Sequence, residues 1–382
     1  MLKNINALLL LLIAYGLSVG VLHAEDRKVI LVVLDGIRWQ EIFRGADPKL
    51  ASDPLTTHFF ETVNERFVAV PDPPSALTPF IHQVIAKQGV LIGDRAVGCC
   101  SAVKNPYWFS YPGYNELFTG YVDRAIDAGV DRENPNVTVF EWLQAKPKYR
   151  NKVRLFGSWE SFDHLVSVKR SGLPVNAGFR SVDTNPNDAE KLLNQLQDDL
   201  PRMWHNVRND ALTFRYAMES FKRDRPEVLF IGLGESDDYG HARAYDQYLF
   251  SLARADRFIK ELWTAVQADR RYKNRTTLIV TTDHGRGDGK ASPWTNHGSG
   301  LTTTKKTATP IEIAQGSDET WAGLLGPDIA AQSEHITELS KNPCVFADQV
   351  AATLLQSLKI DPAAYNPATG KRIGKSLLLD AR

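Results

Sequence analysis

Acidic and histidine residues recur in short groups along the chain, and their side chains are suited to binding metal ions. The residues concerned are Asp35, Asp237, His241, Asp283, His284 and His297. Carboxylate oxygens and imidazole nitrogens together form a ligand set that zinc accepts. Asp237 and His241 are four residues apart, so both can reach the same side of a helical turn. These groups predict a metal-dependent active site.

Each group also has an ordinary structural explanation. Asp35-Gly36 is a common turn sequence, and acidic residues such as Asp237 and Asp238 are favoured at the N-terminus of a helix. Three histidines lie beside glycines near predicted strand ends, namely His241, His284 and His297. We interpret the others that follow residue 24 as structural, namely His58, His82, His164, His205 and His335.

Ser110 is the candidate nucleophile. Ser110-Tyr111-Pro112 precedes a short helical pattern at residues 113–119 that stops at Gly120. Proline is favoured in the first helical turn, which places Ser110 at or near the helix N-terminus, where free amides and the helix dipole attract phosphate oxygens. Coordination to a metal ion would convert the weakly nucleophilic hydroxyl largely to alkoxide. The alternative is that Ser110 is only an N-cap.

Strand and helix patterns alternate around these residues. Four apolar runs have the composition of buried parallel strands, at residues 28–34, 152–156, 227–233 and 276–280. Asp35, Asp237 and Asp283 follow three of these runs, and sites in open α/β sheets form beyond the carboxyl ends of strands. The alternation predicts an α/β fold, a three-layer α/β/α sandwich with a mainly parallel central sheet.

Residues 166–226 differ from this alternation. They are polar, with clusters of proline, asparagine and aspartate, and they contain helical patterns at 188–199 and 203–222. We interpret this segment as a cap insertion beside the sheet, within a single domain at residues 25–382. Further along, residues 293–307 form a predicted polar loop, and residues 309–313 resume an extended pattern.

The N-terminus has the three-part layout of a secretory signal peptide at residues 1–24. Lys3 supplies a positive charge, residues 7–21 are apolar, and Ala24 offers a small residue for cleavage. This apolar run is shorter than the roughly twenty residues that span a bilayer, so we expect no stable membrane span after cleavage. The expected location is periplasmic or secreted.

Charge and cysteine content narrow the function further. Lys and Arg total 45, as do Asp and Glu, so the composition indicates no nucleic-acid-binding surface. Cys99, Cys100 and Cys344 include no CxxC pair, which disfavours a structural zinc site. One disulfide between Cys344 and one member of the vicinal pair suits an exported protein, and the choice between Cys99 and Cys100 is open.

Taken together, the motifs resemble those of the alkaline phosphatase superfamily. The family's order is matched by Asp35, Ser110-x-Pro112, Asp237-x-x-Gly240-His241, Asp283-His284-Gly285 and His297-Gly298. The resemblance covers residues 28–298, most of the chain after residue 24. Among the branches of the superfamily, the chain looks most like the nucleotide pyrophosphatase/phosphodiesterase group and its bacterial relatives.

This resemblance implies an exported hydrolase of phosphoric esters with two divalent metal ions. The ligands of one ion would be Asp237, His241 and His297, and those of the other Asp35, Asp283, His284 and Ser110. Two neighbouring ions suit in-line phosphoryl displacement, in which Ser110 forms a phosphoseryl intermediate that water then hydrolyses. The ligand types favour zinc, with manganese as the alternative.

Some positions separate the chain from other branches or leave choices open. Sulfatases of the superfamily resemble Cys/Ser-x-Pro-x-Arg, and this chain has Tyr114 in place of the arginine, which disfavours sulfatase activity. Family phosphodiesterases contact a phosphate oxygen with an asparagine downstream of the nucleophile. Asn134 and Asn136 are both candidates, although Asn136 could instead cap a helix beginning near residue 137. Lys169 and Arg170 are further candidate phosphate contacts.

Several alternatives stay open at this stage. The enzyme could be a phosphodiesterase or a phosphomonoesterase acting on a small phosphate ester. A sulfatase-like or phosphonate-ester hydrolase on the same fold is a rival within the superfamily, and a non-catalytic periplasmic binding protein is a rival from another class. Nothing in the sequence indicates the natural substrate or the oligomeric state.

Overall fold

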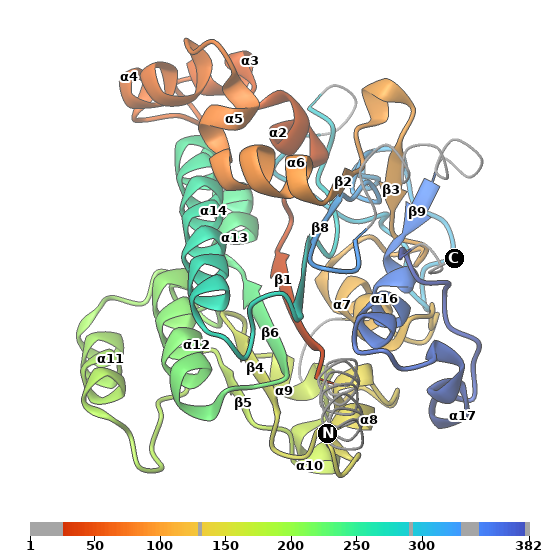
Figure 1. Cartoon of the computed structure of the whole chain (residues 1–382). Helices are drawn as coiled ribbons and strands as arrows, with labels where there is room; N and C mark the ends of the chain where they lie inside the picture. The colour runs from red at the N-terminus through yellow and green to blue at the C-terminus, as the bar shows by residue number, and fades with distance from the viewer. Residues whose placement is uncertain (1–25, 129–131, 290–292, 330–343, 379–382) are drawn as a thin grey trace, which may run out of the picture.

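The fold is built around a seven-stranded sheet with the strand order β2-β8-β7-β1-β6-β4-β5. The computed structural model in Figure 1 describes residues 26–128, 132–289, 293–329 and 344–378. The strands are β1 (Lys28–Leu34), β2 (Val90–Ile92), β4 (Val153–Gly157), β5 (Val175–Ala177), β6 (Val228–Leu233), β7 (Thr276–Thr281) and β8 (Ala322–Leu325). From β7 to β5 all neighbours are parallel, whereas β8 is antiparallel to both β7 and β2. The predicted, mainly parallel sheet is confirmed.

β1 lies in the middle of the sheet, and its sequence explains that position. All of its residues are buried, as expected for a run of mostly apolar, β-branched side chains that is covered on both faces. Successive side chains of a strand point to opposite faces. Ile30 and Val32 therefore belong to one hydrophobic layer, and Leu31 and Val33 belong to the other.

Helices cover both faces of the sheet, so the predicted three-layer sandwich is confirmed (Figure 1). One face carries α12 (Asp210–Asp224), α13 (Glu235–His241) and α14 (Tyr245–Ala268). The other carries α7 (Ser110–Thr119), α8 (Val139–Gln144), α9 (Phe162–Leu165) and α16 (Val350–Ser357). Further helices are α2 (Trp39–Arg44), α3 (Pro48–Ser52), α4 (Phe60–Val63), α5 (Pro73–Leu77), α6 (Ala86–Gln88), α10 (Val168–Ser171), α11 (Asp188–Asp199) and α17 (Asn366–Thr369).

The predicted parallel strands are confirmed as β1, β4, β6 and β7. Two local predictions are wrong. Residues 309–313 lie in a turn, because the Glu312 carboxylate accepts hydrogen bonds from the amide and the hydroxyl of Thr309. The helix predicted over residues 203–222 begins only at Asp210, since Val207 pairs with Trp159 in an isolated β-bridge.

The segment at 166–226 is partly built into the sandwich. It supplies β5, which pairs with β4 at the edge of the sheet. It also supplies α12, whose buried residues belong to the same hydrophobic layer as α14. α11 lies farther from the sheet, beyond α12 (Figure 1). That this segment also acts as a cap over the site stays a prediction.

The predicted signal peptide lies outside the described residues, which begin at residue 26. Within the described ranges, we find no helix with the length and apolar character needed to cross a bilayer.

A second, two-stranded sheet joins distant parts of the chain. β3 (Cys100–Ala102) pairs in parallel with β9 (Cys344–Phe346), and the register places Cys100 opposite Cys344. These two residues form a disulfide, whereas Cys99 is a free thiol. The prediction of one disulfide to Cys344 with one thiol left over is therefore confirmed.

Replacing both Cys100 and Cys344 by serine should lower the free energy of unfolding by about 2–5 kcal/mol. The disulfide joins residues 244 positions apart, so its loss frees a long loop in the unfolded chain. Chemical denaturation followed by fluorescence measures the change. Cys99→Ser is the matched control, because its thiol is in no disulfide. An equal loss of stability in this control would contradict the stabilising role of the bond.

Candidate active site

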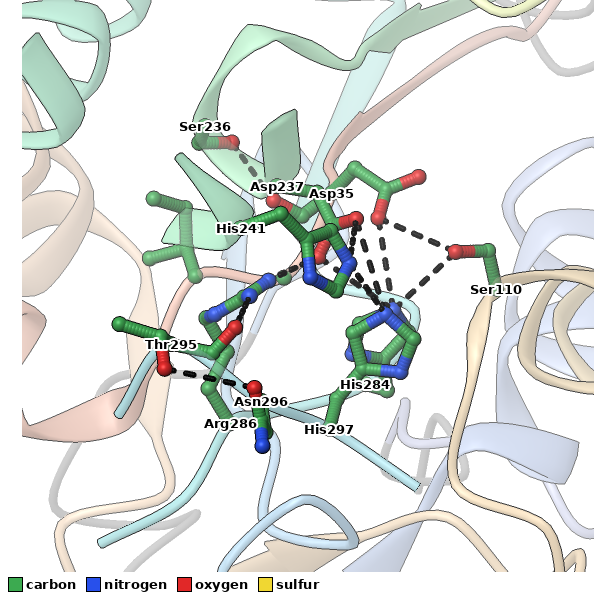
Figure 2. A network of polar contacts seen from close by, with 12 residues as sticks. Asp35, Ser110, Ser236, Asp237, His241, His284, Arg286, Thr295, Asn296 and His297 are labelled. Atoms are coloured by element: carbon green, nitrogen blue, oxygen red, sulfur yellow. Dashed lines mark hydrogen bonds and ion pairs between the residues drawn. The ribbon is translucent and has the colours of Figure 1, made fainter. Parts of the chain in front are cut away.

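The carboxyl ends of three neighbouring strands converge on one site. Asp35 directly follows β1, Asp237 lies on α13 after β6, and Asp283 follows β7. Because β6, β1 and β7 are adjacent and parallel, residues that follow them meet at one edge of the sheet. Figure 2 shows that edge with the other predicted residues, Ser110, His241, His284 and His297.

One group in this site contains Asp35, Asp283, His284 and Ser110. His284 Nε2 lies 3.4 Å from an Asp35 oxygen and 3.5 Å from an Asp283 oxygen. The Ser110 hydroxyl oxygen lies 3.1 Å from His284 Nε2 and 3.4 Å from Asp35 Oδ1. On its other side, the His284 ring has Nδ1 at 2.7 Å from the carbonyl oxygen of Gly285. Donation by Nδ1–H to that carbonyl leaves the lone pair of Nε2 free to bind a metal ion.

The second group contains Asp237, His241 and His297. Asp237 Oδ2 lies 3.1 Å from His241 Nε2 and 3.7 Å from His297 Nε2. The two Nε2 atoms are 2.9 Å apart. Three potential ligand atoms from α13 and from the loop at 293–298 therefore face one another across a short gap.

The two groups adjoin. His284 Nε2 lies 4.0 Å from Asp237 Oδ1, and the ring centroids of His284 and His297 are 4.3 Å apart. Two sets have their potential ligand atoms within 4.8 Å of one another, namely Asp35, Asp283 and His284, and Asp237, His284 and His297. The two sets share His284, and His241 belongs to neither of them.

Burial makes the charges of this site unfavourable without a cation. Asp35 and Asp283 are almost fully buried, and burial raises the pKa of both carboxyls, with a further rise from neighbouring carboxylates. Burial alone would lower the pKa of His284, but Asp283 and Asp35 raise it to about 10. Asp283 Oδ2 is buried and has no hydrogen-bond partner among the described residues. A divalent cation would compensate these charges, so the residues present fit a metal ion.

Ser110 lies where an N-terminal helix residue was predicted, but it does not cap the helix. It is the first residue of α7, and Phe109 occupies the N-cap position. The first intrahelical hydrogen bond is donated by Gly113 to the carbonyl of Phe109. The amides of residues 110 and 111 precede that bond, at the positive end of the helix dipole. The Ser110 hydroxyl instead faces Asp35 and His284 (Figure 2).

Gly113 allows α7 to approach the metal-binding groups closely. A Cβ atom at this position would lie 2.4 Å from the carbonyl oxygen of Asp283, which is closer than atoms of this kind pack. The absence of a side chain at Gly113 therefore helps to set the distance between Ser110 and the loop after β7.

Gly113→Ala should lower kcat on the order of 10- to 100-fold, because the added methyl group displaces the first turn of α7 and misplaces Ser110. Overpacking should also lower the free energy of unfolding by about 1–3 kcal/mol. Steady-state kinetics and thermal denaturation measure the two effects. Unchanged kcat in a folded variant would show that α7 can shift without disturbing the nucleophile.

Arg286 is a further residue of the site that the sequence did not indicate: it is fully buried and forms an ion pair with Asp237. Burial alone would raise the pKa of Asp237, but Arg286 and His297 hold it well below its usual value. The available signal was the position of Arg286 two residues after His284. Nothing in its type or spacing indicated which carboxylate it would contact.

Within the described residues, the hydrogen bonds of Asn134 and Asn136 go to groups other than the proposed metal ligands and Ser110. The amide nitrogen of Asn134 donates to Asn115 Oδ1 and to the carbonyl of Leu165. The amide nitrogen of Asn136 donates to Asn115 and to Asp123. Both side chains therefore hold the segment that follows α7, and we assign a phosphate contact to neither.

Lys169 and Arg170 likewise have acidic partners that are not proposed metal ligands. The Arg170 guanidinium pairs with Glu141 and donates to the backbone carbonyls of residues 134 and 136. Lys169 Nζ lies 3.5 Å from Glu133. The helix that was predicted to begin near residue 137 is α8, and Thr138 caps it.

The chain resembles known proteins both in sequence and in fold. The family profile described as type I phosphodiesterase / nucleotide pyrophosphatase matches residues 106–359, more than half of the chain. Among curated proteins, GPI ethanolamine phosphate transferase 1 from Homo sapiens is 26% identical over 212 residues, covering 53% of this chain and 20% of that protein. The chain thus spans about a fifth of the length of that relative.

Several solved structures share the fold at low sequence identity. Wild-type alkaline phosphatase PafA has a TM-score of 0.53 and 10% identity, with 88% of this chain and 96% of that chain covered. The lipoteichoic acid synthase LtaP from Listeria monocytogenes has a TM-score of 0.51 and 10% identity, with 94% and 76% covered. An alkaline phosphatase superfamily protein from Vibrio parahaemolyticus has a TM-score of 0.51 and 12% identity, with 88% and 67% covered.

Proposed function

Because the chain belongs to the type I phosphodiesterase / nucleotide pyrophosphatase family, we propose that it hydrolyses phosphoric esters with Ser110 as the nucleophile. The family is part of the alkaline phosphatase superfamily, and the chain has the fold of that superfamily. Members of the superfamily hydrolyse or transfer phosphate or sulfate esters. The serine nucleophile and the preference for phosphate rest on the site itself.

The observation that carries the proposal is the position of the Ser110 hydroxyl against Asp35 and His284. Carboxylates alone would oppose ionisation of a serine hydroxyl, because like charges repel. A cation among Ser110, Asp35, Asp283 and His284 would reverse this effect and favour the alkoxide. The arrangement therefore supports a metal-dependent nucleophile over a serine activated by a histidine base alone.

The residues present suit two divalent metal ions. We assign one ion to Asp35, Asp283, His284 and Ser110, and the other to Asp237, His241 and His297. Zinc fits this mixture of carboxylate and imidazole ligands, and manganese is the alternative. When bound, the ions would lower the pKa of the serine hydroxyl and compensate negative charge on the phosphate.

The chain's own residues supply the positioning and the covalent step. The Ser110 hydroxyl oxygen attacks phosphorus, forming an O–P bond while the bond from phosphorus to the leaving alcohol oxygen breaks. The hydroxyl proton leaves to solvent when the alkoxide forms, and the departing alcohol oxygen takes up a proton from solvent. The amides of residues 110 and 111 stabilise charge on the phosphate oxygens. Water then hydrolyses the phosphoseryl bond and regenerates Ser110.

Tyr114 supports phosphate esters over sulfate esters as substrates. The sulfatase motif of the superfamily would place an arginine at this position. Tyr114 is instead fully buried, and its ring centroid lies 4.8 Å from that of Phe162 in the hydrophobic layer beneath the site. The side chain at this position therefore supplies a neutral hydroxyl, hydrogen-bonded to Asp35, where a sulfatase would have a cation.

Hydrolysis and phosphoryl transfer share the attack by Ser110 and differ in the acceptor of the second step. The human relative is named an ethanolamine phosphate transferase, so transfer to an alcohol is the second candidate activity. We favour water as the acceptor because the match to this relative covers only 53% of the chain. We further propose a small phosphate ester as the substrate and an exported protein, supported by the apolar N-terminal run and the disulfide.

A panel of chromogenic esters tests the proposed function. Zinc-loaded protein is assayed with nitrophenyl phosphate, bis-nitrophenyl phosphate and nitrophenyl sulfate, each with and without ethanolamine as an alcohol acceptor. We expect turnover of a phosphate ester with release of free phosphate or phosphomonoester. The ratio of the turnover rates on the monoester and the diester then decides between a phosphomonoesterase and a phosphodiesterase. A preference for sulfate would support the sulfatase-like alternative. Two bound ions with no turnover would support a non-catalytic binding protein.

A further inference from the structure

Arg286 is a buried cation in the active site that the proposed chemistry does not use. Its side chain is fully buried, and it follows β7 two residues after His284. A buried arginine is costly unless its donors are satisfied. Those donors are aimed at two separate segments that each carry a proposed metal ligand (Figure 2).

The first segment is α13, where Arg286 Nη1 pairs with Asp237 Oδ1. The other oxygen of this carboxylate, Oδ2, faces His241 at 3.1 Å and His297 at 3.7 Å. Arg286 therefore occupies one Asp237 oxygen and leaves the other directed toward the two histidines. Such contacts to a ligating carboxylate set its orientation.

The second segment is the loop that ends at His297. Arg286 Nε donates to the carbonyl of Trp294 at 2.9 Å, and Nη2 donates to the carbonyl of Thr295 at 2.5 Å. These two carbonyls lie three and two residues before His297. One guanidinium thus links the segment of Asp237 to the segment of His297.

Gly240 shows how tightly this guanidinium is enclosed. A Cβ atom at Gly240 would lie 2.5 Å from Arg286 Cζ, so the glycine in Asp237-x-x-Gly240-His241 makes room for the arginine. The planar guanidinium has several donors in a fixed arrangement, so it can bind the Asp237 carboxylate and the carbonyls of Trp294 and Thr295 together. A lysine ammonium could not reach all three acceptors.

We infer that Arg286 is a positioning residue that assembles the metal site of Asp237, His241 and His297, and that it leaves the site of Asp35, Asp283 and His284 largely unaffected. This inference rests on the proposed two-metal function. It predicts that loss of the guanidinium weakens one metal site more than the other, because its ion pair and hydrogen bonds to described residues go to the segments of Asp237 and His297.

Zinc titration against a chromophoric chelator tests the inference without an activity assay. The wild-type protein should show two dissociation constants, which His241→Ala and Asp283→Asn assign to the two sites. In Arg286→Gln, the zinc dissociation constant of the site that contains His241 should rise by about 10- to 100-fold. The dissociation constant of the other site should change far less. Arg286→Lys should give an intermediate weakening. Gly240→Ala, which keeps the arginine but displaces it, should weaken the same site.

Arg38→Gln is the matched control. Arg38 is also a buried arginine, and it pairs with Glu41 and donates to the carbonyl of Gly287 at 3.2 Å, but it contacts none of the proposed ligands. Loss of the Arg38 guanidinium should lower the melting temperature without weakening zinc binding at one site more than at the other. Equal weakening of both sites in Arg286→Gln, or no weakening in Gly240→Ala, would overturn the inference alone. Fewer than two ions in the wild type would overturn the proposed function as well.

Discussion

Replacing Ser110 by alanine should reduce kcat for phosphate esters on the order of 10,000-fold or more. The hydroxyl is the group proposed to form the bond to phosphorus, so its loss removes the covalent route and leaves only the effects of metal ions and binding. The ligands Asp35, Asp283 and His284 stay in place, since their mutual contacts do not depend on the serine. Three of the four proposed ligands of that ion therefore remain, and metal analysis of the variant in excess zinc should still show both ions.

Ser251→Ala is the control for this substitution. Its hydroxyl is buried and donates to the carbonyl of Tyr248 within α14, so its loss removes a serine hydroxyl without touching the site. We expect kcat close to that of the wild type. If Ser110→Ala kept a tenth or more of the wild-type kcat, Ser110 could not be the nucleophile.

Removing the metal ions with a chelator should abolish turnover and lower the stability of the protein. Asp35 and Asp283 are buried beside one another and beside Asp237, so their repulsion is uncompensated once a cation leaves. Ligand binding at 100 to 1,000 times its dissociation constant contributes about 3–4 kcal/mol to the free energy of unfolding. The melting temperature of the metal-free protein should fall accordingly, and calorimetry measures the difference.

Adding zinc back should restore both activity and melting temperature, and parallel additions of manganese and magnesium compare the candidate ions. His241→Ala should need more zinc for recovery than the wild type, because it lacks one proposed ligand. Full turnover by protein with less than stoichiometric metal, as measured by elemental analysis, would contradict a metal-dependent mechanism.

Much of the site could be predicted because its residues follow the strands whose sequence patterns are easiest to recognise. β1, β6 and β7 are long, apolar runs whose burial pattern leaves little ambiguity. Parallel strands place their carboxyl ends at one edge, so the residues that follow them were expected to meet. Asp35 and Asp283 lie at that edge, each beside His284 Nε2.

Other features could not be predicted, for different physical reasons. β2 and β5 have three residues each, too few for a periodic pattern to separate a strand from a loop. Their assignment depends on neighbours supplied by the rest of the sheet. Arg286 and the two asparagines depend on side-chain contacts across the fold, such as that between Asn134 and Asn115, which sequence spacing does not encode.

The most direct test of the central claim is to look for phosphate on Ser110 during turnover. Zinc-loaded protein is mixed with a phosphate ester, quenched in acid within the first turnovers and digested for mass spectrometry. We predict a phosphorylated peptide whose modified residue is Ser110 and which is absent in the Ser110→Ala variant. Steady turnover with Ser110 unmodified at every quench time, together with direct transfer of solvent oxygen to phosphorus in one inverting step, would contradict the account.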